Sequence, residues 1–138
     1  MKFLHGQNSL APTLLRITIG VILVSHGLPK VLAIGAFITN VGNMVPFPLN
    51  WIFGIGTILV EVGCGALLIA GLKGRLMGLI TGIWFLGISA VVHWRALFDV
   101  FNLVGNDRQG EFEFPFLIAI AAISIALTGP GKFSVTED

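Results

Sequence analysis

The sequence contains little charge for its length. Among its 138 residues, eight are Lys or Arg and seven are Asp or Glu, so that charged residues make up 11% and the formal net charge is +1. The basic residues are scattered along the chain, and such a pattern presents no basic face to a nucleic-acid backbone. This composition excludes nucleic acid as a partner.

Cysteine is almost absent as well. The single residue, Cys64, lies within an apolar stretch. One cysteine forms neither an internal disulfide nor a Cys-x-x-Cys dithiol. Thiol–disulfide chemistry within one chain is therefore excluded, and the sequence predicts no metal site.

Apolar residues are what the chain has in abundance. Hydrophobic residues make up 55% of the sequence, and the mean hydropathy is +0.94. A bilayer core of about 30 Å is crossed by roughly 20 helical residues. Four segments have this length and character, at about residues 12–34, 51–70, 76–98 and 112–128. The sequence predicts an all-α protein, a transmembrane four-helix bundle in the lipid bilayer, with residues 1–138 as one domain.

Basic residues and small residues indicate how the four helices are arranged. Four spans place both termini on one side, and five basic residues fall on that side against three on the other: Lys2, Arg16, Lys73, Arg75 and Lys132 against Lys30, Arg95 and Arg108. This asymmetry favours cytoplasmic termini. The uncharged segment 35–50 is expected to be irregular and either to lie at the membrane interface or to fold over the helix ends. Gly74, Gly78 and Gly82 recur every four residues and predict close helix packing.

Six ionisable residues lie within the predicted spans, where an unpaired charge is costly. They are Arg16, His26, Lys30, Glu61, His93 and Glu113. A rise of about 1.5 Å per residue places His26, Lys30 and His93 roughly 21 to 27 Å from the cytoplasmic side and Glu61 near the midplane. Five of the six, all except Arg16, are thus expected in the outer half of the bundle, where His26, Lys30, Glu61 and Glu113 are the candidate catalytic residues of a shared polar pocket.

The expected pairings follow from these depths. Lys30 and Glu113 would form an ion pair near the membrane surface. His26 lies one turn before Lys30 on the same helix face, and Glu61 would lie within reach of His26. Such pairs also fix helix packing without any chemistry. Arg16 is expected to extend to the cytoplasmic surface. His26 and His93, at similar depth, also suggest bis-histidine haem binding, although Lys30 and Glu61 would crowd a haem. An alternative for His93 is an interfacial histidine beside Trp94.

Three stretches together resemble a known family. LLRITIGVILVSHGLPKVL, EVGCGALLIAGLKGR and EFPFLIAIAAISIALTGPGKFS are similar to sequences of the DoxX family of small four-helix membrane proteins of bacteria and archaea. The resemblance implies a multi-pass protein of the cell (inner) membrane, associated with oxidoreductase systems such as thiosulfate oxidation feeding the quinone pool. It supplies no catalytic residues to carry over, and the sequence departs from the commonest pattern at Glu111-Phe112-Glu113.

Three functions remain open at this point. The first is a quinone-linked oxidoreductase subunit, in which the pocket supplies hydrogen-bond donors and protons to a quinone, while a membrane or soluble partner or a bound cofactor supplies electrons. The second is a non-enzymatic subunit or scaffold of a larger complex or homo-oligomer. The third is a small transporter or proton relay, which four helices without internal repeats disfavour.

Overall fold

The computed structural model describes residues 9–93 and 109–136, and this part of the chain is mainly helical. Its elements are α1 (Leu10–Leu32), α2 (Ile34–Gly42), α3 (Leu49–Ile58), the π-helical segment η3 (Leu59–Cys64), α4 (Gly65–Ala70), α5 (Gly74–Val91) and α7 (Gln109–Thr128). Helices α3, η3 and α4 follow one another without a break and form one long helix. The predicted all-α membrane bundle is confirmed.

Three helices are long and apolar enough to cross a membrane. They cover Leu10–Leu32, Leu49–Ala70 and Gly74–Val91, and the apolar part of α7, Phe112–Thr128, is shorter. The predicted spans match these helices to within a few residues, except that the third was expected to reach residue 98. It ends at Val91, and residues 94–98 lie outside the described part of the chain.

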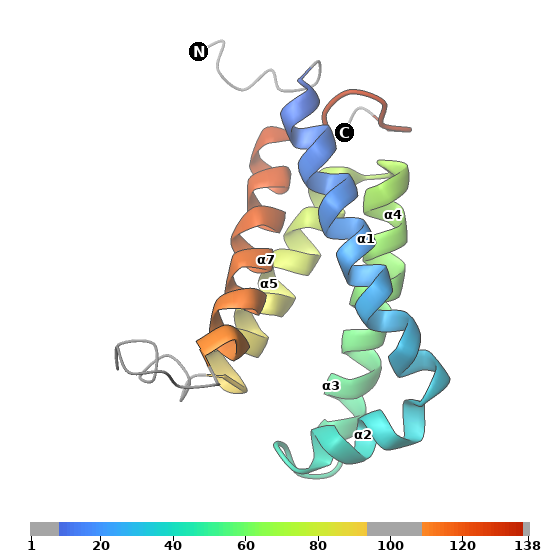
Figure 1. The fold of residues 1–138 in the computed structure, drawn as a ribbon, viewed down its shortest axis with the longest axis vertical. Helices are drawn as coiled ribbons and strands as arrows, with labels where there is room; N and C mark the ends of the chain where they lie inside the picture. The colour runs from blue at the N-terminus through green and yellow to red at the C-terminus, as the bar shows by residue number, and fades with distance from the viewer. Residues whose placement is uncertain (1–8, 94–108, 137–138) are drawn as a thin grey trace.

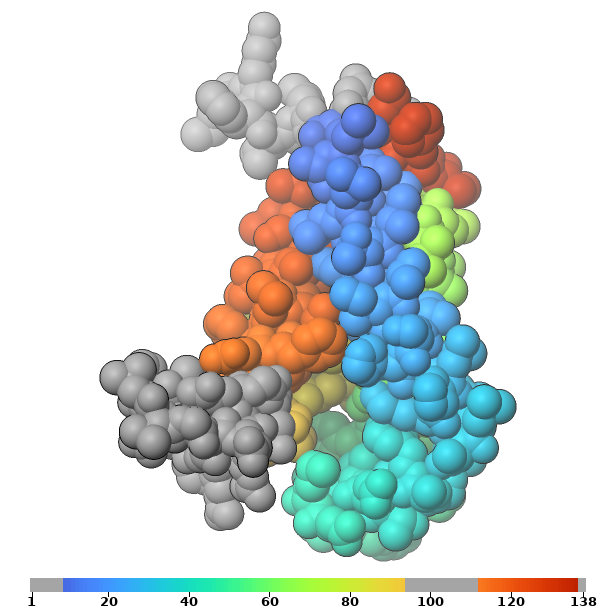
Figure 2. Space-filling model, in the orientation of Figure 1, coloured from blue at the N-terminus to red at the C-terminus, as the bar shows by residue number. Residues whose placement is uncertain are grey.

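The helices associate in two groups (Figure 1). Helix α5 packs along α7, whereas α1 packs along η3 and α4. At one end of the bundle, here called the α2 end, α2 packs on α3, and neither helix packs extensively on α5 or α7. The two groups therefore diverge at the α2 end, and the surface is hollowed there (Figure 2).

The prediction of an irregular segment at residues 35–50 was wrong for its first half, because α2 is a regular helix. Ala33, at φ −122° and ψ 42°, has a non-helical conformation and separates α1 from α2. Ile38 is the buried residue of α2, and it packs so closely on Gly54 that a Cβ there would lie 3.1 Å from Ile38 Cγ1. Burial of one side chain against α3 thus favours a helix that composition alone did not indicate.

Glycines allow the close helix contacts, as predicted for α5. A Cβ on Gly78 would lie 2.6 Å from the Ala122 carbonyl oxygen, and one on Gly82 would lie 2.5 Å from Ile123 Cγ1. On the other side of the bundle, a Cβ on Gly20 of α1 would lie 2.7 Å from the carbonyl oxygen of Gly65. The backbones approach within the reach of dispersion forces, which drive helix association in lipid.

The prediction that Arg16 extends to the cytoplasmic surface was wrong. Its side chain is 1% exposed, and its guanidinium donates to five backbone carbonyl oxygens: Leu68, Ile69, Pro130, Lys132 and Phe133. A guanidinium has five N–H donors, so all of them are used. The carbonyls of Leu68 and Ile69 lie in the last turn of α4, where the helix dipole favours a positive charge.

Residues 129–136 fold back over the ends of α1 and α4, and we call this region the tail end. The Lys132 carbonyl accepts from Thr13 Oγ1 at 2.6 Å, while the backbone N–H groups of Val135 and Thr136 donate to the carbonyl of Gly71. Gly71 has φ +70° and terminates α4 in the left-handed conformation that glycine adopts readily. Arg16 thereby fastens the tail to two helices.

Candidate functional site

A cavity of about 420 Å³ opens at the α2 end, between the two helix groups. Its walls come from α1, α2, α3, η3, α5 and α7 and from the residues that follow α2 and α5. The lining residues are His26, Lys30, Phe37, Val41, Met44, Val45, Phe53, Thr57, Glu61, Ile83, Trp84, Phe85, Gly87, Ile88, Val91, Val92, His93, Phe114 and Pro115. Most of them are apolar, and two of the charged candidates are among them.

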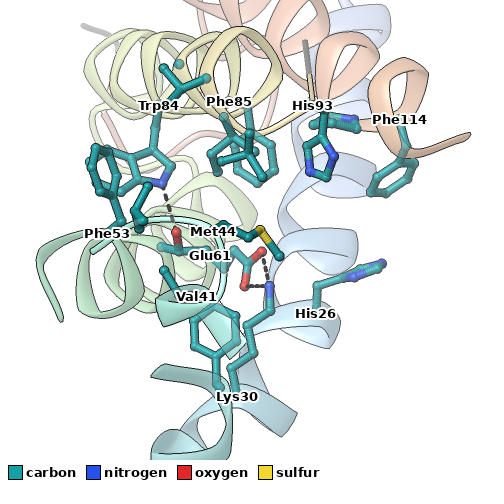
Figure 3. A pocket seen from close by; sticks show the side chains of 18 of the residues that line it. His26, Lys30, Val41, Met44, Phe53, Glu61, Trp84, Phe85, His93 and Phe114 are labelled. Atoms are coloured by element: carbon teal, nitrogen blue, oxygen red, sulfur yellow. Dashed lines mark hydrogen bonds and ion pairs between the residues drawn. The ribbon is translucent and has the colours of Figure 1, made fainter. Parts of the chain in front are cut away.

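Lys30 and Glu61 meet in this cavity (Figure 3). Lys30 Nζ lies 2.5 Å from both carboxylate oxygens of Glu61. The Lys30 side chain is 24% exposed and the Glu61 side chain 5%. Lys30 and Glu61 form an ion pair, and this pair places two opposite charges at the inner surface of a largely apolar cavity.

The π-helical turn positions Glu61. Within η3 the N–H of Gly65 donates to the carbonyl of Val60, five residues earlier, so the helix accommodates one more residue per wide turn than an α-helix. The turn buries Val60, Glu61 and Cys64. Such segments are frequent at functional sites, and no feature of the sequence indicated this one.

The ion pair differs from the expected pairing of Lys30 with Glu113. Glu113 is exposed and is not among the residues that line the cavity. The reason is that Lys30, in the last turn of α1, faces η3 rather than α7. Its ammonium also lies 5.2 Å from the centre of the Phe37 ring on α2, so an aromatic face covers the charge.

His26 and His93 line the same cavity from different elements. The His26 ring lies 5.4 Å from that of Phe114 on α7, centroid to centroid, and thus forms a contact across the two helix groups. His93 follows α5, on the same side as Phe114 (Figure 3). Bis-histidine haem binding by this pair stays a prediction.

An aromatic wall faces the ion pair, and sequence reasoning did not identify it. The Trp84 indole N–H donates to Thr57 Oγ1 at 3.2 Å, and the Phe53 and Trp84 rings lie 6.1 Å apart. The indole lies so close to Gly56 that a Cβ there would overlap its six-membered ring. Phe53, Gly56 and Thr57 follow the i, i+3, i+4 spacing of one helix face, and that spacing is the signal from which their common contact could have been predicted.

The cavity combines few polar groups with apolar and aromatic walls. Lys30 supplies a charged donor, His26 a group that both donates and accepts, and Glu61 a carboxylate. No cluster of three or more potential metal ligands occurs in residues 9–93 and 109–136. This arrangement suits an apolar ligand that carries a hydrogen-bond acceptor.

Comparison with known proteins identifies the family. Searches of curated proteins and of solved structures return no match. The DoxX family model matches residues 11–94, which is more than half of the chain and covers α1 to α5, including the Lys30–Glu61 pair. The chain belongs to the DoxX family, and its long apolar helices make it a multi-pass membrane protein.

Proposed function

We propose that this protein is the quinone-binding subunit of a membrane oxidoreductase. The observation that carries the proposal is the Lys30–Glu61 ion pair at the inner surface of a cavity otherwise lined mainly by apolar side chains. A quinone has carbonyl oxygens that accept hydrogen bonds, on a ring that is soluble in lipid. In the proposed site, Lys30 would bind a carbonyl oxygen and the apolar lining would contact the ring.

The dimensions and lining of the cavity are consistent with such a ligand. A volume of about 420 Å³ falls within the range of small-molecule pockets, which are about 300 to 1,000 Å³. The ammonium of Lys30 is only partly exposed and would donate to a carbonyl oxygen, while Glu61 fixes the ammonium in place. The charge-assisted hydrogen bond is among the stronger polar contacts available.

The proposed chemistry divides between this chain and a partner. Reduction of a quinone to a quinol takes up two electrons and two protons. Lys30 and His26 would donate hydrogen bonds and one proton each at the two oxygens, and water at the mouth of the cavity would return a proton to each of them, while the Glu61 carboxylate holds the ammonium in place. The electrons are assigned to a partner protein or a bound cofactor, because one cysteine provides no dithiol within the chain that could carry them. Glu113 lies outside the cavity and receives no role.

A binding measurement tests this proposal. The chain in lipid nanodiscs is dialysed against 2-methyl-1,4-naphthoquinone, beside the double variant Lys30→Met/Glu61→Leu, which removes both charges together. The control Lys132→Met removes a positive charge at the tail end, far from the cavity. Loss of a charge-assisted hydrogen bond predicts about tenfold or more weaker binding for the double variant and no change for the control. Absence of binding to the unaltered chain, or equal affinities in all three, would refute the proposal.

Measuring complex assembly beside turnover distinguishes a quinone-binding subunit from a purely structural one. Glu61→Gln and His26→Ala are introduced into the host, and quinone-dependent oxidation by isolated membranes is measured beside co-purification of partner subunits. The quinone proposal predicts lost turnover with an intact complex. Retained turnover with a dissociated complex would show instead that the polar groups serve assembly.

The proposed setting is the cell inner membrane with both ends of the described chain cytoplasmic. The start of α1 and residues 129–136 lie together at the tail end, which also carries Lys73, Arg75 and Lys132. Their positive charges support a cytoplasmic tail end. The cavity at the α2 end would then open in the outer half of the bilayer.

A further inference from the structure

The wall opposite the ion pair is built around one indole ring. Trp84 on α5 lines the cavity together with Phe53 and Thr57 of α3. In Figure 3 the indole lies on the α5 side of the chamber, whereas Lys30 and His26 project from α1 on the other side. A ligand between these walls would meet charge on one side and a flat aromatic surface on the other.

The position of the indole is fixed at three points. Its N–H is bound by Thr57 Oγ1 at 3.2 Å, its six-membered ring lies on Gly56, where a Cβ would overlap it, and Phe53 lies 6.1 Å away at an interplanar angle of 46°. This separation lies within the range of about 4.5 to 7 Å at which aromatic rings interact. The ring therefore cannot rotate freely, and it forms a preformed surface of the cavity.

We infer that Trp84 is the specificity-determining residue of the cavity, selecting a planar, electron-poor ring over a saturated ligand of the same size. This inference rests on the proposed function, since it concerns the same ligand. An electron-rich indole stacks favourably on a ring depleted of electrons by its carbonyls, and stacking adds to the burial of apolar area. A puckered aliphatic ring gains burial alone. Gly56 and Thr57 act as positioning residues for the indole.

The second contact between the helix groups supports this assignment. His26 meets Phe114 at the α1–α7 side, whereas Trp84 meets α3 at the other side. The cavity thus has an aromatic contact on two sides. A flat ligand would fit between these two contacts without displacing the rings that form them. Aliphatic residues such as Val41 and Ile88 complete the lining and accept apolar ligands without regard to shape.

Selective binding tests the inference. Two probes with the same fused ten-carbon skeleton are used in nanodiscs, 2-methyl-1,4-naphthoquinone and its fully saturated ring analogue, a decahydronaphthalenedione. Trp84→Leu is expected to weaken binding of the naphthoquinone about three- to tenfold and to leave the saturated diketone unchanged. Trp84→Phe, which keeps a ring, is expected to retain most of the preference. Trp51→Leu, an exposed tryptophan of α3 outside the cavity, serves as the control.

Three results would overturn the inference: an equal loss of affinity for both probes, an unchanged preference in Trp84→Leu, or the same effect in Trp51→Leu. Thr57→Val keeps the side-chain shape and removes the acceptor, so it provides a milder test if Trp84→Leu fails to fold. It is expected to reduce the preference for the planar probe without lowering the affinity for the saturated one. An unchanged preference in a folded Thr57→Val would contradict the positioning role.

Failure of the inference can be told apart from failure of the proposed function. If quinone binding depends on Lys30 and Glu61 but not on Trp84, the quinone site stands and the specificity assignment is wrong. If naphthalene, which has no carbonyl, binds as tightly as the naphthoquinone and both depend on Trp84, the planar selectivity stands and the quinone proposal is wrong.

Discussion

At the scale of single residues, the cations Arg16 and Lys30 are stabilised within the helix bundle in different ways. Arg16 is satisfied by backbone carbonyls at the tail end, whereas Lys30 is paired with a carboxylate beside an open cavity. The first arrangement uses every donor and leaves none for a ligand. The second leaves part of the ammonium exposed, which is why Lys30 and not Arg16 is the candidate for chemistry.

We predict that Lys30→Met destabilises the protein by roughly 3 kcal/mol, because it leaves the buried Glu61 carboxylate without its partner. The double variant Lys30→Met/Glu61→Leu should recover most of that loss, since neither charge then remains in an apolar setting. Unfolding in detergent, followed by circular dichroism, measures both. A double variant as unstable as the single one would contradict the assigned pairing.

Arg16→Lys should also be destabilising, by at least about 2 kcal/mol, although the charge is kept. An ammonium has three donors and no planar fork, so carbonyls among those of Leu68, Ile69, Pro130, Lys132 and Phe133 would be left unsatisfied in a buried site. Lys132→Gln, at an exposed position nearby, is the matched control. Equal melting temperatures for Arg16→Lys and the unaltered protein would show that the five hydrogen bonds contribute little.

Much of the candidate site could be predicted at this scale, because a charge within an apolar run needs a partner. His26, Lys30 and Glu61 do line one cavity. The partner of Lys30 and the burial of Arg16 could not be predicted, because both depend on the rotation of helices about their axes. The rise per residue gives the height of a side chain in the membrane and not the direction it faces.

At the scale of elements, helix spacing is set by glycines that lie against backbone. Gly78→Ala should destabilise the α5–α7 pair by about 2 kcal/mol or more, because the added methyl would lie 2.6 Å from the Ala122 carbonyl and 3.0 Å from the Ala126 nitrogen. A methyl added at Gly87, in the same helix, would have nothing within 4 Å. Gly87→Ala should be neutral or stabilising by up to about 1 kcal/mol. Thermal melting of the two variants compares them, and a similar loss in both would contradict the packing described.

The π-helical turn is the element that sequence analysis could not supply. Residues 51–70 have the apolar character of an ordinary transmembrane helix, and a wide turn within such a helix leaves hydropathy unchanged. Its effect is local, in that it buries Glu61 and Cys64 together. Helix α2 was missed for a related reason, since nine residues with one buried contact carry too little periodicity to be recognised.

At the scale of the whole molecule, the structure has a closed end and an open end. The tail end is tied by Arg16, Thr13 and residues 129–136, while at the α2 end the two helix groups diverge around the cavity. Three of the four predicted spans correspond to helices that are long and apolar enough to cross a membrane, and they were predictable from hydropathy because burial in lipid requires long apolar segments. The difference between the two ends was not predictable, because it arises from contacts between distant parts of the chain.

The orientation of the molecule can be tested with thiol labelling. Cys64 is buried and is first replaced by Ala; Lys73→Cys then places a thiol at the tail end and Met44→Cys one at the α2 end. We expect a membrane-impermeant maleimide to label Met44→Cys in intact cells and Lys73→Cys only after the membrane is opened, because basic residues favour the cytoplasmic side. The reverse pattern would show that the cavity opens toward the cytoplasm.

The central claim is that the Lys30–Glu61 cavity holds a quinone in the membrane where the protein works. The most direct measurement is the amount of quinone extracted per mole of protein after gentle purification from its native membrane, for the unaltered chain and for Lys30→Met/Glu61→Leu. We expect a stoichiometric quinone with the unaltered chain and, with the double variant, only the quinone that co-purifies with background lipid. The same quinone content in both, or none in either, would contradict it.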